Sequence, residues 1–218
     1  MEYRQIDLST YPRREHFRLF QSMENPFISM TVNLDITGFL ERVHREGKPF
    51  TLTLQYEITK AANTLAPFRQ RIREGGIVEF PFCEASYVVL RPDGSYRYCD
   101  VFPSLPFGEY VEKARAAEKK ALSEETLSDG PDSLSMYFFS SVPGISFLSV
   151  NEPYADRNFS NPSFLFGKYQ TAPEWVLQEG QPQMVIRTRM PLVIRVNHAL
   201  MDGVHLQHFL EELESRLA

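Results

Sequence analysis

Four side chains that can bind protons or metals lie close together near the C-terminus, where a strand pattern passes into a helix pattern. They are His198, Asp202, His205 and His208, and all four fall within eleven residues. A neutral imidazole can take a proton from a hydroxyl or a thiol near pH 7, because its pKa is close to that value. A position just past a strand end would fix the ring and leave its tip in a cleft. His198 is therefore a candidate general base, and Asp202 a candidate for holding the turn.

Two other interpretations of these residues stay open. Histidine and aspartate are zinc ligands, but regular spacings of three along a helix spread side chains around it, which disfavours a shared metal. Alternatively, Asp202 is only the cap of a helix, at the positive end of its dipole, and Gly203 allows a tight turn. His205 and His208 are then ordinary surface or half-buried side chains. We expect no metal here.

The composition limits the classes of protein to consider. The chain has 218 residues, of which 43% are hydrophobic, and this predicts a single domain, residues 1–218, with a sizeable core. The formal charge of −5 and the lack of a basic stripe argue against nucleic acid. A polar N-terminus predicts no signal peptide, and no apolar run approaches the roughly 20 residues of a membrane span. Cys83 and Cys99 make no disulfide framework. We therefore expect a cytoplasmic globular protein without nucleic-acid or membrane partners.

Hydrophobic spacing predicts the elements that position the candidate residues. Residues 10–23 predict a short helix capped by Ser9 or Thr10, and strict alternation over 27–34 predicts a half-buried strand. Further helices are predicted over 35–47, over 51–66 with Pro67 as its end, over 106–125, and from Val204 onward, and further strands over 135–141, 145–150, 163–170 and 184–196. The alternation predicts an α/β fold with a large mixed sheet and packed helices.

Ordered segments along nearly the whole chain carry a resemblance to a known family. The segment NHALMDG has the form H-x-x-x-D-G of the CoA-dependent acyltransferases. Together with four upstream segments it resembles one branch of them, the chloramphenicol O-acetyltransferases; these segments are YPRREHFRLFQS, TVNLDITGFLERV, FFSSVPGISFLSV and FGKYQ. The resemblance implies that family's fold, a two-layer sandwich of a large sheet and helices.

The resemblance also implies chemical roles. His198 matches the general base that removes the proton of an acceptor hydroxyl, so that the oxygen attacks the thioester of acetyl-CoA directly. Ser140 matches the serine whose hydroxyl binds the oxyanion of the tetrahedral intermediate. Asp202 and Arg13 match a buried ion pair that ties the final turn to the first helix and so aims the ring.

Ligands and assembly follow from the same resemblance. Lys168 and Tyr169 match the side of the site that holds CoA, and Phe20 and Leu165 match the side that holds the acceptor. Acetyl-CoA is implied as co-substrate and chloramphenicol as the first acceptor to consider. A homotrimer is implied, in which the base of one subunit faces an acceptor pocket lined largely by its neighbour.

Departures from the family pattern affect the pockets more than the chemical groups. Gly144 stands where the family has a tryptophan near the CoA arm, and Leu165 where it has a threonine that holds the acceptor through water. One alternative is therefore a related acyltransferase with another small hydroxylated acceptor. A second, from a different class, is a non-catalytic ligand-binding protein on the same fold.

Overall fold

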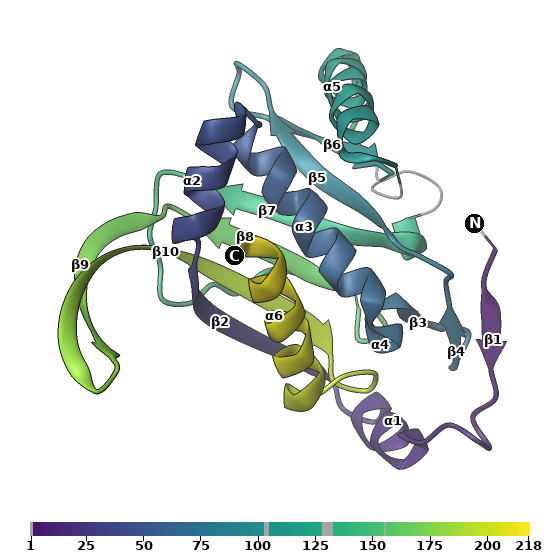
Figure 1. Cartoon of the computed structure of the whole chain (residues 1–218). Helices are drawn as coiled ribbons and strands as arrows, with labels where there is room; N and C mark the ends of the chain where they lie inside the picture. The colour runs from purple at the N-terminus through teal and green to yellow at the C-terminus, as the bar shows by residue number, and fades with distance from the viewer. Residues whose placement is uncertain (1, 103–104, 128–132, 155) are drawn as a thin grey trace.

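A large mixed sheet forms the centre of the molecule (Figure 1), which is known from a computed structural model that describes residues 2–102, 105–127, 133–154 and 156–218. Within these residues the sheet has seven strands: β2 (Phe27–Asp35), β5 (Glu84–Leu90), β6 (Tyr96–Val101), β7 (Met136–Val142), β8 (Ser163–Gly167), β9 (Gln170–Gln178) and β10 (Gln181–Asn197). They lie in the order β2-β10-β8-β7-β5-β6, and β9 pairs with β10 outside that path. A smaller sheet has the order β1-β4-β3, from β1 (Arg4–Ile6), β3 (Gln70–Arg73) and β4 (Gly76–Glu79).

Helices cover one face of the large sheet and leave the other without helices in the described part of the chain (Figure 1). Their bounds are α1 (Arg14–Gln21), α2 (Thr37–Glu46), α3 (Phe50–Thr64), α4 (Ala66–Arg69), α5 (Phe107–Ser123) and α6 (Gly203–Leu217), with a 3-10 turn over Ser133–Ser135. The predicted α/β architecture, a large mixed sheet layered with packed helices, is confirmed. None of the helices among these residues has both the length and the apolarity needed to cross a bilayer.

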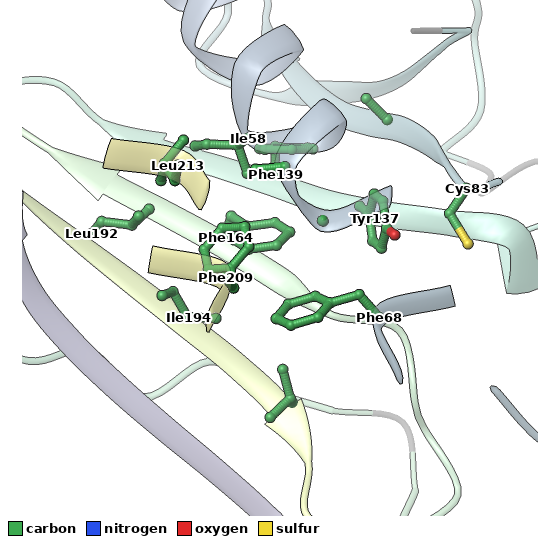
Figure 2. Packing of buried hydrophobic residues seen from close by; sticks show 14 of the residues in the cluster. Ile58, Phe68, Cys83, Tyr137, Phe139, Phe164, Leu192, Ile194, Phe209 and Leu213 are labelled. Atoms are coloured by element: carbon green, nitrogen blue, oxygen red, sulfur yellow. The ribbon is translucent and has the colours of Figure 1, made fainter. Parts of the chain in front are cut away.

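Aromatic rings join the sheet to the helices in the core (Figure 2). Phe209 of α6 lies between Phe164 of β8 and Phe68 of α4, with ring centroids 5.4 and 5.0 Å apart, and all three are fully buried. Since successive strand residues point to opposite faces, Phe164 points to the helices while its neighbours Ser163 and Leu165 point to the helix-free face. The same strands that pack apolar side chains against the helices therefore present polar side chains to the helix-free face.

Most predicted elements are present, and the exceptions have physical causes. The 145–150 strand prediction is wrong, because β7 and β8 pair directly in parallel and both neighbours of β7 in the sheet are taken. The connection between them must leave the sheet. The strand β9 was not predicted, although residues 184–196 do form a strand, which is continuous over the whole of β10.

Two predicted helix ends also differ. The first helix starts after Arg13 without a side-chain cap, so Ser9 and Thr10 do not cap it. The helix expected to end at Pro67 ends at Thr64 instead, and Pro67 lies in the first turn of α4, where the missing backbone N–H costs nothing. Gly47 does end α2, in the left-handed conformation.

Candidate active site

His198 lies in the turn between β10 and α6, and its half-buried ring has a fixed plane. The ring stacks on Phe20 of α1, with centroids 3.9 Å apart and planes 14° from parallel. The backbone N–H of His198 donates to the carbonyl oxygen of Pro26 at 2.7 Å. Phe20 thus contacts the candidate base from the first helix, while the backbone bond ties the turn to the start of β2.

The ring nitrogens of His198 have different surroundings. Nδ1 lies 2.8 Å from the carbonyl oxygen of Met201. A carbonyl oxygen only accepts, so this hydrogen bond requires the proton on Nδ1. In the neutral ring the lone pair is then on Nε2, which is the arrangement a general base needs.

Asp202 is the N-cap of α6 and the partner of Arg13. Its carboxylate accepts from the backbone N–H of Val204 at 3.2 Å and lies 2.7 Å from Nδ1 of His205. The Arg13 guanidinium is ion-paired with the same carboxylate and donates to the carbonyl oxygen of His198 at 3.4 Å. The side chains of Arg13 and Asp202 are 15% and 30% exposed. The pair is therefore half-buried, whereas the family resemblance implies a buried pair.

This environment lowers the pKa of Asp202. Partial burial raises the pKa, but the hydrogen bonds from Arg13 and His205 outweigh it and hold the value at about 2. The carboxylate is therefore charged near neutral pH. It contacts the backbone of the turn and not the ring of His198 in any hydrogen bond among the described residues.

The other two histidines of the segment have different surroundings from His198. Nδ1 of His205 donates to the carboxylate of Asp202 in the first turn of α6, and His208 is exposed on the same helix. The described residues contain no group of three or more His, Cys, Asp or Glu side chains placed to hold a metal ion.

Ser140 lines a cavity of about 880 Å³ on the helix-free face of the sheet. It lies in β7 directly opposite Leu165 of the parallel strand β8, and Leu165 lines the same cavity. The remaining lining residues among those described are mostly aromatic, aliphatic or hydroxylated: Ser86, Val88, Leu90, Tyr96, Tyr98, Phe138, Phe139, Ser141, Pro143, Val150, Asn151, Glu152, Pro153, Tyr154, Phe159, Ser163 and Arg195.

His198 is not among the described residues that line this cavity, and the strand register explains why. Ser140 is level with Leu165, and Leu165 is level with Val193 of β10. From Val193 the chain runs five residues further to His198. With strands about 4.8 Å apart and a rise of about 3.3 Å per residue, the Cα atoms of Ser140 and His198 are about 15–20 Å apart in one chain. One copy of the chain thus does not bring the two predicted catalytic side chains together.

Lys168 and Tyr169 lie just beyond β8 and are exposed, outside the cavity lining described above. The backbone N–H of Lys168 donates to the carbonyl oxygen of Ile145 at 2.8 Å, and the ring of Tyr169 lies 5.7 Å from that of Phe50. The preceding Gly167 packs closely, since a Cβ there would be 2.7 Å from the same carbonyl oxygen. The G-K-Y segment is therefore fixed against the connection after β7.

Arg195 is a polar residue of the cavity that neither the motifs nor the family resemblance indicates. It lies in β10 level with Ser163 of β8, and both line the cavity together with Glu152. The sequence contains one sign of its role, which is that a charged residue stands among apolar neighbours near the end of the strand pattern over 184–196.

Comparisons with known proteins identify the family. The family model "CAT: Chloramphenicol acetyltransferase" matches residues 1–214. A chloramphenicol acetyltransferase from Proteus mirabilis is 33% identical, with 96% of this chain and 92% of the relative covered, and one from Escherichia coli is 31% identical, with 97% and 92% covered. A solved structure of a chloramphenicol acetyltransferase superposes with a TM-score of 0.79 at 22% identity and covers all of both chains. These matches confirm the predicted family and its enzyme class, the acyltransferases. The chain belongs to the chloramphenicol acetyltransferase family.

Proposed function

We propose that this protein transfers the acetyl group of acetyl-CoA to a hydroxyl of chloramphenicol, with His198 as general base. The observation that carries the proposal is the fixed ring of His198, whose Nδ1 donates to the carbonyl oxygen of Met201 and whose Nε2 is thereby left to take a proton. The curated relatives named chloramphenicol acetyltransferase support the choice of reaction and acceptor.

The reaction needs no covalent enzyme intermediate. Nε2 of His198 takes the proton of the acceptor hydroxyl as its oxygen attacks the thioester carbonyl carbon of acetyl-CoA. Negative charge moves to the carbonyl oxygen, where the Ser140 hydroxyl donates a hydrogen bond. The C–S bond then breaks, the charge returns to form the ester carbonyl, and the departing sulfur takes the proton from the imidazolium. Lys168 and Tyr169 are proposed on the CoA side, and Phe20 and Leu165 on the acceptor side.

The active site is proposed to lie between copies of the chain, in a homotrimer. The separation of His198 from Ser140 in one chain supports this arrangement. A general base and an oxyanion donor that act on the same reacting group must both lie within a few ångströms of it. A neighbouring copy that places its His198 at the mouth of the cavity would supply the missing base. In a closed assembly of identical chains the same interface is repeated around the ring, so each interface would hold one such site.

An exposed apolar surface on the β9–β10 hairpin also supports self-association. In the antiparallel register Trp175 is level with Met184, and Leu177 with Pro182, so these side chains share one face. Trp175 and Leu177 are 73% and 77% exposed in the single chain. Figure 1 shows this hairpin extending out beyond the other strands of the sheet and the helices. Contiguous apolar surface of this kind marks an interface.

The cytoplasm is the proposed location. Cys83 and Cys99 are buried free thiols rather than a disulfide, as expected of a reducing compartment. Acetyl-CoA as a co-substrate fits the same compartment.

A thiol-release assay tests the proposal. Purified protein with acetyl-CoA and chloramphenicol is expected to release free CoA thiol, and His198→Ala to lower the rate at least about 100-fold. His44→Ala, which changes an exposed histidine of α2, is the matched control and is expected to keep wild-type activity. Retention of more than a few per cent of activity by His198→Ala would refute the assigned base.

Acceptor choice is tested separately. Activity with another hydroxylated acceptor but not with chloramphenicol would keep the chemistry and change the substrate. Tight binding of chloramphenicol without thiol release from any acceptor would instead favour a non-catalytic binding protein.

A further inference from the structure

Arg195 brings a buried positive charge to the wall of the cavity that Ser140 lines. Its residue exposure is 7%, and it lies on the helix-free face of β10 between the rings of Phe27 and Phe159, whose centroids are 5.7 and 5.6 Å from its guanidinium carbon. Those rings hold the guanidinium group by cation–π contact. The charge is therefore ordered and largely removed from bulk water.

Only one edge of this guanidinium is used by the protein. Nη1 donates to the backbone carbonyl oxygens of Glu152 and Pro153, both at 2.8 Å. Nε and Nη2 form no hydrogen bond with any residue that the structure describes, and neither atom is sealed away from accessible space. This unused pair of parallel N–H groups is the edge with which arginine binds two coplanar oxygens.

No described carboxylate forms an ion pair with Arg195. The carboxylate of Glu152 is taken instead by the hydroxyl of Ser163, which donates to Oε2 at 2.7 Å. Burial lowers the pKa of Arg195, and the charge of Glu152 only partly opposes that effect. A buried guanidinium whose second edge has no partner leaves a place for a ligand group.

We propose that the Nε–Nη2 edge of Arg195 binds a planar group with two oxygens, a nitro group or a carboxylate, at the far end of the acceptor. This inference rests on the proposed acetyl transfer, because it assigns the acceptor to the cavity that holds Ser140. Chloramphenicol carries a nitro group on its ring, at the end remote from its primary hydroxyl. A carboxylate would present the same two oxygens with a full charge.

The sheet register also sets the shape of that acceptor. Arg195 is level with Ser163, which lies two residues before Leu165, the partner of Ser140. Two strand spacings and two residues of rise put the Cα atoms of Arg195 and Ser140 about 12 Å apart. The acceptor is therefore elongated, with its reacting hydroxyl near Ser140 and its two-oxygen group near Arg195, and its middle lies against Leu165 and the aromatic walls.

Calorimetric binding without acetyl-CoA tests the inference independently of catalysis. The probes are chloramphenicol and two analogues in which the ring carries either a carboxylate or hydrogen in place of the nitro group. The wild-type protein is expected to bind the nitro compound several-fold, and the carboxylate about tenfold, more tightly than the hydrogen analogue. Equal binding of all three would overturn the inference, whereas absence of thiol release with these preferences intact would overturn only the proposed reaction.

Variants assign the preference to the proposed edge. Arg195→Gln is expected to bind all three probes alike, and Arg195→Lys to keep part of the preference for the carboxylate but lose that for the nitro group, because an ammonium lacks the planar edge. Glu152→Gln, which removes a neighbouring negative charge, is expected to strengthen carboxylate binding. Arg187→Gln, on the same strand but outside the cavity, is the matched control and is expected to keep every preference. Unchanged preferences in a folded Arg195→Gln protein would refute the assignment, and Arg195→Lys provides the test if the glutamine variant does not fold.

Discussion

The guanidinium of Arg13, immediately before α1, is ion-paired with the carboxylate of Asp202, the N-cap of α6. The pair joins the first and last helices, 189 residues apart in sequence. Arg13 also donates to the backbone carbonyl of His198, so the pair braces the turn that carries the proposed base. The carboxylate of Asp202 therefore positions the ring through the backbone of the turn, and not by a direct hydrogen bond to the imidazole.

Removing the charge of Asp202 should lower the turnover rate more than it weakens substrate binding. Asp202→Asn keeps a side-chain oxygen that can cap α6, but it loses the ion pair with Arg13. The turn then holds His198 less accurately, and kcat is expected to fall about tenfold to a hundredfold while KM stays within about twofold. Steady-state thiol-release kinetics measure both constants. An unchanged kcat would show that the ion pair does not position the base.

The same carboxylate predicts how stability depends on pH. The pKa of Asp202 is about 2 in the folded protein, below its usual value of 3.8. The unfolded chain therefore binds the proton more readily, so the stabilisation is fully present above pH 3.8 and is lost as pH falls through 2. Because the group is partly exposed, we expect about 1–2 kcal/mol. Urea unfolding between pH 2 and 5 should show the stability gap between the wild type and Asp202→Asn closing over this window. A gap that stays constant with pH would contradict the assignment.

Gly167 should be intolerant of a side chain because of close backbone packing. A Cβ at this position would lie 2.7 Å from the carbonyl oxygen of Ile145 and 2.6 Å from the ring of Phe147. Gly167→Ala is expected to lower the free energy of unfolding by about 1–3 kcal/mol, since a backbone atom has to move. Gly144→Ala is the control, because a Cβ there meets nothing within 4 Å. Chemical denaturation of the two variants should separate them clearly, and equal stabilities would show that the packing is looser than described.

The apolar face of the β9–β10 hairpin should be required for assembly. Trp175→Lys places a charge on that face and is expected to shift the protein toward the monomer. Light scattering coupled to gel filtration measures this shift, and activity is expected to fall in proportion to the loss of the oligomer. Gln178→Lys adds the same charge to the opposite face of the hairpin and should leave the oligomer intact. A Trp175→Lys protein that keeps the wild-type oligomeric state would mean that this face of the hairpin lies outside the interface.

Local patterns in the sequence predicted the elements around His198 better than they predicted the cavity. The stripe of Leu206, Phe209 and Leu213 fixes α6, and all three are buried as a helix period requires. The β9 strand was missed because Pro173 interrupts the strand pattern and the apolar face of Trp175 has no core in the single chain to pack against.

The cavity depends on which strands become neighbours, and periodicity does not determine that. Arg195 and Ser163 meet because β8 lies beside β10, and Ser140 joins them because β7 lies beside β8. The sequence alone placed Ser140 only through its resemblance to a family. It gave one sign of Arg195, a charged residue among buried apolar neighbours, but no indication of the space in front of it.

Mixing two inactive variants should restore activity if the active site is shared between copies. His198→Ala still supplies Ser140, and Ser140→Ala still supplies His198, so a mixed trimer contains some interfaces with both wild-type groups. Random assembly from equal amounts gives such interfaces in about a quarter of the sites, and activity after joint denaturation and refolding is expected to rise toward that fraction of wild type. Each variant refolded alone, and the two mixed without unfolding, are the controls and should keep the low activity of the parents. Activity of the co-refolded mixture equal to the mean of the two parents would mean that the base and the oxyanion group do not come from different copies, which contradicts the separation that the sheet register imposes within one chain.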